Sequence, residues 1–303
     1  MPKSSHTAET TQTAQRLARA AVRALYAELV LEPKPGLVSL RDTGSHSDMD
    51  ASHFVRSLFA LRHYFAYMVR AGADGAPFAR LQTLGQQAEA RMLAATGGIN
   101  THRGAIFCLG LLCASAGWRS AHALPLHPQG LRDSLLQQWG AALQARAARA
   151  RQLPARSHGQ RAARAHGLRS AGDEAALGFP VLFGTTLPAL LRAQAQAWPD
   201  RSARAQALFA TMAVLDDTNL VHRGGMPGLL DAQQAAQRFL QAGGAGVPDW
   251  RARARAVHHD FVARRLSPGG SADLLGAACW IAQVCAASTR VAAPAPLAAL
   301  LRV

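Results

Sequence analysis

Apolar residues recur at steps of three and four along most of the chain, which is the spacing of one face of an α-helix. In residues 51–70 this face is formed by Phe54, Leu58, Leu61, Phe65 and Met68. The same spacing predicts helices over about 12–31, 77–95, 105–116, 131–153, 173–197, 202–215, 232–242, 250–266 and 271–291. Alternation of polar and apolar residues in stretches rich in Val, Ile and Thr, which is typical of strands, is missing. We therefore expect an all-α fold.

The helices should form a single compact multi-helix domain over residues 15–303, with Gly- and Pro-rich active-site loops between them. The chain has 303 residues and is 49% hydrophobic, which is enough to bury a sizeable core. Residues 1–14 are polar and rich in Thr, so we expect a disordered tail without the apolar centre of a signal peptide. The sequence contains no run of eighteen apolar residues, so it predicts no membrane-spanning helix. Four cysteines in apolar stretches suit buried thiols in a reducing compartment. These features favour a cytoplasmic protein.

The charge balance favours phosphate-bearing partners. Lys and Arg number 33 against 18 Asp and Glu, a formal charge of +15, and Lys3 and Lys34 are the only lysines. Guanidinium groups bind phosphate oxygens in pairs, although a genome that favours Arg and Ala would give the same composition. Arginines accumulate in a basic surface insertion around 146–169, which we interpret as a partner-binding surface or a mobile segment. Trp and Tyr are not interleaved with them, so stacking on nucleic acid is disfavoured.

One candidate site is the loop of residues 34–50, which contains two prolines and two glycines. Loops with so many polar residues often form sites. Lys34 could contact a phosphate. His46, Asp48 and Asp50 could bind a divalent cation, or one of these carboxylates could take a proton from a hydroxyl. Asp48 and Asp50 could equally be helix N-caps.

A second candidate is the glycine-rich turn of residues 95–104, which leads directly into an apolar helix. Backbone N–H groups at a helix start bind anions. Asn100, Thr101, His102 and Arg103 follow the turn, and Arg103 adds further donors. The segment therefore suggests a polyphosphate site.

Acidic residues at three further junctions could bind a metal or cap helices. Asp216 and Asp217 are adjacent and should repel each other unless a cation or an arginine such as Arg223 compensates, so Mg²⁺ is a natural inference. Glu174 and Asp273 each lie close to a predicted helix start, where a carboxylate also interacts favourably with the helix dipole. The residues alone predict an α-helical enzyme that binds a polyphosphate with Mg²⁺.

Together these segments closely resemble the triphosphoribosyl-dephospho-CoA synthase family. The most specific matching strings are Pro33 to Val38, Asp48-Met49-Asp50, Ala95 to Phe107, Asp217-Thr218-Asn219 and Gly269 to Leu275. The resemblance implies a transferase that joins the triphosphoribosyl group of ATP to the 2′-hydroxyl of 3′-dephospho-CoA and releases adenine. The form of residues 57–65 and 97–103 is more similar to the malonate decarboxylase branch than to the citrate lyase branch.

The resemblance also suggests roles for the candidate residues. Asp48 or Asp50 would be the base, and Asp216, Asp217 and Glu174 would hold Mg²⁺ on the triphosphate. The phosphate ligands would be Lys34, Arg103 and Arg223. His102 and Asn100 would orient ribose or adenine, and the remaining substrate contacts would come from His46, Thr101, Asn219 and Asp273. Glu174 and Asp273 are the alternative bases.

The expected partners are ATP and 3′-dephospho-CoA, with functional links to a phosphoribosyl-dephospho-CoA transferase and to the acyl carrier protein of the decarboxylase. An oligomer is compatible with the sequence. Three other functions compete with this one: a Mg²⁺-dependent hydrolase of ADP-ribose-type linkages, a basic nucleic-acid-binding protein, and a helical adaptor for the acyl carrier protein. The acids beside glycines argue against the two that are not enzymes.

Overall fold

The computed structural model describes residues 3–155 and 157–292, and within these ranges every regular element is a helix. Residues 1–2, 156 and 293–303, which include the outer ends of the predicted tail and domain, lie outside the described residues. The α-helices are α1 (Lys3–Leu29), α2 (Ala51–Leu61), α3 (Tyr64–Ala73), α4 (Phe78–Ala95), α5 (Arg103–Ala121), α6 (Pro128–Gln152), α7 (His158–His166), α8 (Ala171–Ala176), α9 (Leu187–Ala195), α10 (Asp200–Met212), α11 (Thr218–Gln241), α12 (Trp250–Ala263) and α13 (Gly269–Ala292). A π-helical turn, Leu182–Thr186, precedes α9, and a 3₁₀ turn, Gly244–Gly246, follows α11. The predicted all-α class is confirmed.

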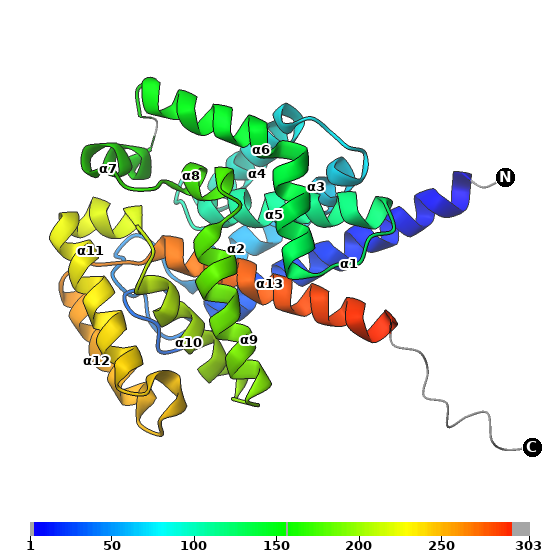
Figure 1. The fold of residues 1–303 in the computed structure, drawn as a ribbon. Coiled ribbons are helices and arrows are strands. Elements are labelled where there is room, and N and C mark those ends of the chain that lie inside the picture. Colours follow the sequence, from blue (N-terminus) through cyan, green and yellow to red (C-terminus); the bar gives the residue numbers. More distant parts are fainter. Residues whose placement is uncertain (1–2, 156, 293–303) are drawn as a thin grey trace, which may run out of the picture.

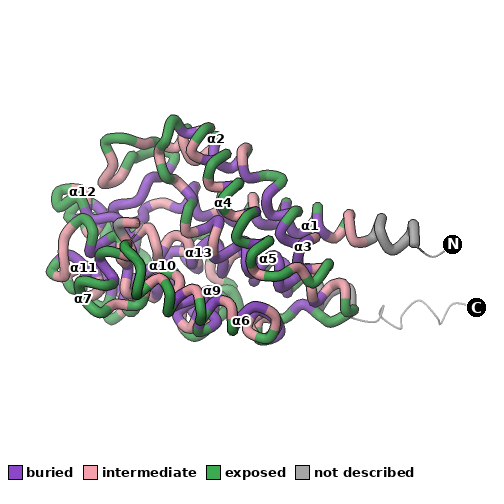
Figure 2. Tube along the Cα trace, turned by 90° about the horizontal axis from the view of Figure 1, so that it is seen from above, coloured by how far each residue is buried: buried purple, intermediate pink, exposed green. Residues whose placement is uncertain are grey.

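The helix α13 crosses the middle of the molecule (Figure 1) and packs against α1, α5, α9 and α10. Buried chain follows the inner helices, and exposed chain covers the periphery (Figure 2). One continuous core joins Leu17 of α1, Phe65 of α3 and Trp280 of α13. The core therefore binds both halves of the sequence into one body.

Glycines allow α3 and α5 to pack with their backbones in contact. A Cβ at Gly72 would overlap the carbonyl oxygen of Ala114, and one at Gly117 would overlap that of Val69. The hydroxyl of Tyr64 donates to the carbonyl of Ile106 over 2.8 Å, beside Gly110. Side chains larger than hydrogen at these crossings would separate the two helices.

Two predicted helices are interrupted. Residues 51–70 form α2 and α3 with a break at Arg62 and His63, and residues 173–197 divide after α8. In the second break Gly178 and Phe179 both have positive φ, and Pro180 follows them. Proline disfavours a helical conformation in the residue before it, so the helix breaks here although the spacing of apolar residues continues.

Two helices begin where the sequence predicted none. The basic insertion contains α7, which Ser157 caps by accepting from the backbone N–H of Gln160. The helix α11 begins at Thr218 rather than near 232 and contains a non-helical residue, Gly225. The positive φ of Gly225 interrupts the periodicity of the apolar residues, which explains why the first turns of α11 were missed.

The first described elements also differ from the expected tail. The helix α1 begins at Lys3, and the first buried apolar side chain among residues 10–29 is Ala14. Among the described helices, Arg103–Ala121 and Gly269–Ala287 are long and apolar enough to cross a membrane, but 72% and 56% of their windows are buried inside the fold. Core packing accounts for this hydropathy, so the two helices are weak evidence for a membrane protein. The four cysteines are free thiols, and Cys279 is the one that is not fully buried.

Candidate active site

The N-terminal ends of α5, α11 and α13 meet around two aspartates. Asp217 caps α11 by accepting from the backbone N–H of Asn219 over 3.1 Å. Its other oxygen accepts from the backbone N–H and the hydroxyl of Ser271 in α13, over 2.9 and 3.1 Å. Asp273, one turn into α13, accepts from the backbone N–H of Ala105 in α5. The two carboxylates therefore tie three helix starts together.

A buried ion pair lies next to these aspartates. Lys34 donates from Nζ to Oε1 of Glu28 over 2.6 Å and to the Glu28 carbonyl over 2.9 Å. Their side chains are 1% and 7% exposed. Burial lowers the pKa of Lys34, and the charge of Glu28 opposes this effect. The lysine therefore neutralises a carboxylate of the protein, and its ammonium group is not presented to solvent.

We call Glu28, Lys34, His102, Asp217 and Asp273 the central cluster. It holds more carboxylates than cations. Burial raises the pKa of Asp273 well above its usual range, and the charges of Glu28 and Asp217 raise it further. Burial also raises the pKa of Asp217, against the hydrogen bonds that it accepts. Burial and neighbouring negative charge therefore favour the protonated form of Asp273 over that of an exposed aspartate.

His102 is neutral, and one of its ring nitrogens has no partner. Its Nδ1 lies 2.7 Å from the hydroxyl of Ser57, while Nε2 is buried without a hydrogen bond in the described structure. Burial and the charge of Lys34 lower the pKa of His102 to about 3. The hydroxyl of Ser57 has no other acceptor among the described residues, so we assign its proton to the bond with Nδ1 and the ring proton to Nε2. His102 thus offers a donor to a ligand.

A second group, which we call the loop group, joins the predicted loop 34–50 to α11 and to the start of α13. His46 lies 3.0 Å from the hydroxyl of Ser267 through Nε2 and accepts from Arg223 over 2.9 Å through Nδ1. Asp48 lies 3.6 Å from the same ring nitrogen. Burial and the charge of Arg223 lower the pKa of His46 to about 4. The loop group therefore places Arg223 in contact with the segment that the sequence singled out.

A third group, which we call the arginine-acid group, lies on the other side of the start of α11. Arg169 lies 3.3 Å from Glu174 and 3.9 Å from Asp216, and its backbone N–H donates to Asp216 over 3.2 Å. Glu174 also accepts from the backbone N–H of Val181 over 3.2 Å. Burial raises the pKa of Glu174, and Arg169 opposes the effect. The sequence predicted that an arginine such as Arg223 would compensate Asp216 and Asp217. In the structure Arg169 lies beside Asp216, and Arg223 does not.

The three predicted Mg²⁺ ligands are divided between two groups. Asp217 points into the central cluster, whereas Asp216 and Glu174 share Arg169. Within the ranges that the structure describes, no group of three or more His, Cys, Asp or Glu side chains could hold a metal ion. The arrangement does not fit a metal held by protein ligands alone. Asp216 and Glu174 fit the one or two carboxylates that bind Mg²⁺ together with substrate phosphates.

The remaining candidates lie at helix starts, where they satisfy the backbone. Asp50 caps α2, accepting from the backbone N–H groups of Ser52 and His53, and its side chain is 54% exposed. Bonds from Ser52 and His53 lower the pKa of Asp50. Asn100 accepts from the backbone N–H of Arg103, whose side chain pairs with Glu89 over 2.5 Å.

The predicted anion site at the start of α5 is therefore already served by protein groups. Asn100 and Asp273 accept from backbone N–H groups of its first turn. Thr101 has a buried hydroxyl with no partner in the described structure.

Several residues of these groups were missed in the sequence. Glu28 follows Leu17, Ala21 and Leu25 on the buried face of α1, and Ser57 lies on the apolar face of α2. A carboxylate or a hydroxyl on an apolar face is the signal that could have identified both. Arg169 and His258 gave no such signal. His258 lies 3.2 Å from Asp42 and 3.0 Å from the carbonyl of Lys34, which only the fold brings near.

Comparison with known proteins gives one consistent result. The profile of the ATP:dephospho-CoA triphosphoribosyl transferase family matches residues 14–290. The chain is 40% identical over 258 residues to 2-(5''-triphosphoribosyl)-3'-dephosphocoenzyme-A synthase of Pectobacterium atrosepticum, covering 83% of each chain. It is 39% identical over 273 residues to a protein of Acinetobacter calcoaceticus with the same name, qualified as probable, covering 90% of this chain and 92% of the relative. No solved structure matches the chain.

Proposed function

The chain belongs to the ATP:dephospho-CoA triphosphoribosyl transferase family, and from this premise we propose that its reaction takes place where α5, α11 and α13 begin. It is a transferase that acts on ATP and 3′-dephospho-CoA. The observation that carries the proposed location is the convergence of Asp217, Asp273 and a buried His102 nitrogen without a hydrogen-bond partner in the described structure on these helix ends.

The chemistry needs one acid and one base. The 2′-hydroxyl oxygen of 3′-dephospho-CoA attacks C1′ of the ATP ribose, and the bond from C1′ to N9 of adenine breaks. The hydroxyl loses a proton and the adenine gains one, so the net reaction releases no proton. Positive charge develops at the ribose, and a carboxylate nearby stabilises it, as in glycoside hydrolysis.

The central cluster can supply these proton transfers. Burial and the charges of Glu28 and Asp217 raise the pKa of Asp273, which favours the protonated form, and this form would give its proton to the departing adenine. Asp217 of this cluster, or Glu174 of the neighbouring arginine-acid group, would then accept the hydroxyl proton. Nε2 of His102 would donate a hydrogen bond to the nucleotide. The assignment of the base to Asp48 or Asp50 remains an alternative, although the capping of α2 gives Asp50 another task.

We propose that Asp216 and Glu174 would hold Mg²⁺ bound to the triphosphate, where the ion would neutralise phosphate charge. Arg169 and Arg223, one on each side of the start of α11, would bind the remaining phosphate oxygens. In this arrangement Lys34 and Arg103 act within the protein, because each already pairs with a carboxylate.

The physiological assignment is also a proposal. The form of residues 57–65 and 97–103 supports the malonate decarboxylase branch, in which the product would pass to a phosphoribosyl-dephospho-CoA transferase and then to the acyl carrier protein. The alternative is that the same product supplies the prosthetic group of citrate lyase. The free thiols support a cytoplasmic location.

The direct test is incubation of the protein with ATP, Mg²⁺ and 3′-dephospho-CoA while adenine release and product mass are followed together. We expect adenine together with a dephospho-CoA adduct that carries triphosphoribose. Adenine without the adduct would support a hydrolase instead.

Variants locate the chemistry in the same assay. Asp273→Asn should lower turnover about 10²- to 10⁴-fold, as for loss of a general acid. Asp133→Asn, at an exposed site on α6, is the control for loss of a carboxylate. If Asp48→Asn or Asp50→Asn abolished turnover and Asp273→Asn did not, the base would lie in the loop and the proposed location would be wrong.

A further inference from the structure

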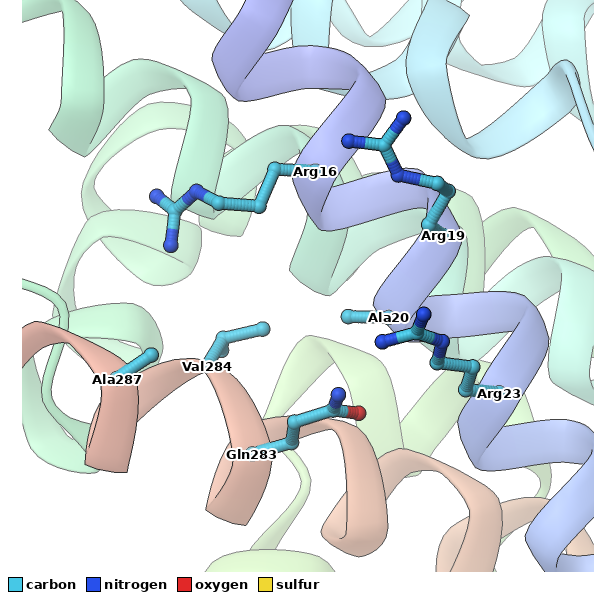
Figure 3. Close-up of a pocket in the computed structure, with 7 residues that line it drawn as sticks. All are labelled: Arg16, Arg19, Ala20, Arg23, Gln283, Val284 and Ala287. Carbon is cyan, nitrogen blue, oxygen red and sulfur yellow. The ribbon is translucent and has the colours of Figure 1, made fainter.

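A groove separate from these groups runs between α1 and α13. Its cavity measures about 370 Å³ and is lined by Arg16, Arg19, Ala20, Arg23, Gln283, Val284 and Ala287 (Figure 3). Gln283 follows Asp273 by ten positions on α13, and helical rise places it roughly 15 Å from the central cluster. The groove is therefore outside the reach of the catalytic groups.

One wall of the groove is a row of arginines. Arg16, Arg19 and Arg23 are the only arginines of α1 and project from one face at spacings of three and four. All three are exposed, and none forms an ion pair with a carboxylate in the part of the chain that the structure describes. Neighbouring guanidinium groups repel one another, so an anion between them would relieve a cost that the free protein carries.

The described residues of the other wall carry no charge. Gln283, Val284 and Ala287 of α13 face the arginines, and the side chain of Ala20 points from α1 into the space between the two helices (Figure 3). The amide of Gln283 can donate to or accept from a ligand, while the methyl groups form an apolar floor. A cavity of this size with a few polar groups and an apolar lining is typical of small-molecule sites.

We propose that this groove binds a small molecule that carries a diphosphate, with Arg16, Arg19 and Arg23 on the phosphate oxygens and the apolar wall against the rest of the ligand. Guanidinium groups bind phosphate oxygens in pairs, which suits three of them on one face. The site needs no catalytic residue, and the proposal does not rest on the proposed function.

Protection from arginine modification tests the proposal site by site. Phenylglyoxal reacts with exposed arginines, and mass spectrometry of peptides reports each position. Inorganic pyrophosphate should slow the modification of Arg16, Arg19 and Arg23 but not that of Arg80, Arg192 and Arg255, which are exposed elsewhere. ADP should protect at lower concentration than pyrophosphate if the apolar wall contacts a nucleoside. Equal protection by both would mean that the diphosphate alone is recognised.

A triple variant gives the second measurement. By calorimetry, Arg16→Gln/Arg19→Gln/Arg23→Gln should bind pyrophosphate at this site about tenfold more weakly, the equivalent of about 1.4 kcal/mol. The matched variant Arg80→Gln/Arg192→Gln/Arg255→Gln loses the same charge and should bind as the parent does. Turnover with saturating ATP should be unchanged in both variants. Uniform protection of all six arginines, or equal weakening in both variants, would show only the effect of net charge and would overturn the proposal.

Discussion

Lys34 shows how far a single residue can be interpreted from sequence. Its rarity marked it as functional, and the structure pairs it with Glu28, an acid that the sequence did not mark. Its partner Glu28 decides its role, and the pairing depends on the return of the chain after α1. The sequence could therefore identify the residue but not whether it binds a phosphate or a protein carboxylate.

Replacing Lys34 distinguishes these two roles. Lys34→Met should lower the free energy of unfolding by about 3–5 kcal/mol, because the carboxylate of Glu28 would remain buried without a partner. The double variant Glu28→Gln/Lys34→Met should recover part of that loss. Urea denaturation measures both. Unchanged stability with a raised KM for ATP would instead identify the lysine as a phosphate ligand.

Asp273 should make stability depend on pH. Its pKa is raised in the folded protein, so above about pH 4, where an unfolded carboxyl ionises, the folded state holds a proton that the unfolded state releases. The contribution of Asp273 to the free energy of unfolding therefore falls as the pH rises toward the folded pKa.

Asp273→Asn should remove this contribution. Relative to the parent, the variant should gain stability as the pH rises from 4 to 8, although its turnover is low. Denaturation curves across this range measure the difference. A constant difference between variant and parent would mean that Asp273 is ionised in the folded protein.

At the scale of elements, the spacing of apolar residues predicted the uninterrupted helices correctly. It did not predict the positions where the backbone leaves the helical conformation. The ranges of α4, α6, α10 and α12 agree with the pattern to within a few residues. The breaks at Arg62 and Phe179 were not predicted, because apolar residues on both sides face the same core. The start of α11, which Asp217 caps, was missed because the kink at Gly225 interrupts the apolar periodicity.

Close packing of α3 on α5 predicts an unequal response to the same substitution. Gly72→Ala should lower the free energy of unfolding by about 1–3 kcal/mol, because its Cβ would overlap the backbone of Ala114. Gly85→Ala in α4 is the matched control. Its nearest atom would be the hydroxyl of Tyr64 at 3.7 Å, so its helix propensity should leave stability equal or raised by up to about 1 kcal/mol. Chemical denaturation of both variants checks the ranking, which equal effects would contradict.

At the scale of the molecule, the positive charge is spread over several surfaces. Arginines lie in the insertion, in the groove between α1 and α13 and around the start of α11. Among those of the insertion, Arg151 pairs with Asp173 and Arg164 donates to carbonyl groups at the end of α6. Composition predicted anionic ligands, but it could not assign each arginine to a ligand, a carboxylate or a helix end.

The net charge itself should give weak binding to DNA that carries no function. Affinity for a duplex should fall steeply between 50 and 200 mM salt, with a log–log slope near −0.9 for each phosphate contacted. Asp273→Asn should bind DNA as the parent does. Fluorescence anisotropy of a labelled duplex measures both, and tight binding that resists salt would revive the nucleic-acid hypothesis.

The two aspartates that join three helix starts also set an order of events during translation. A ribosome makes Glu28 and Lys34 early and adds Asp217 and Asp273 only after most of the other helices. A nascent chain that has reached α10 would contain the ion pair and His102 but neither aspartate. Such a chain could not perform the proposed proton transfer to adenine. If Asp273 acts as proposed, reactivity toward ATP requires the docking of α13, the last helix to be made.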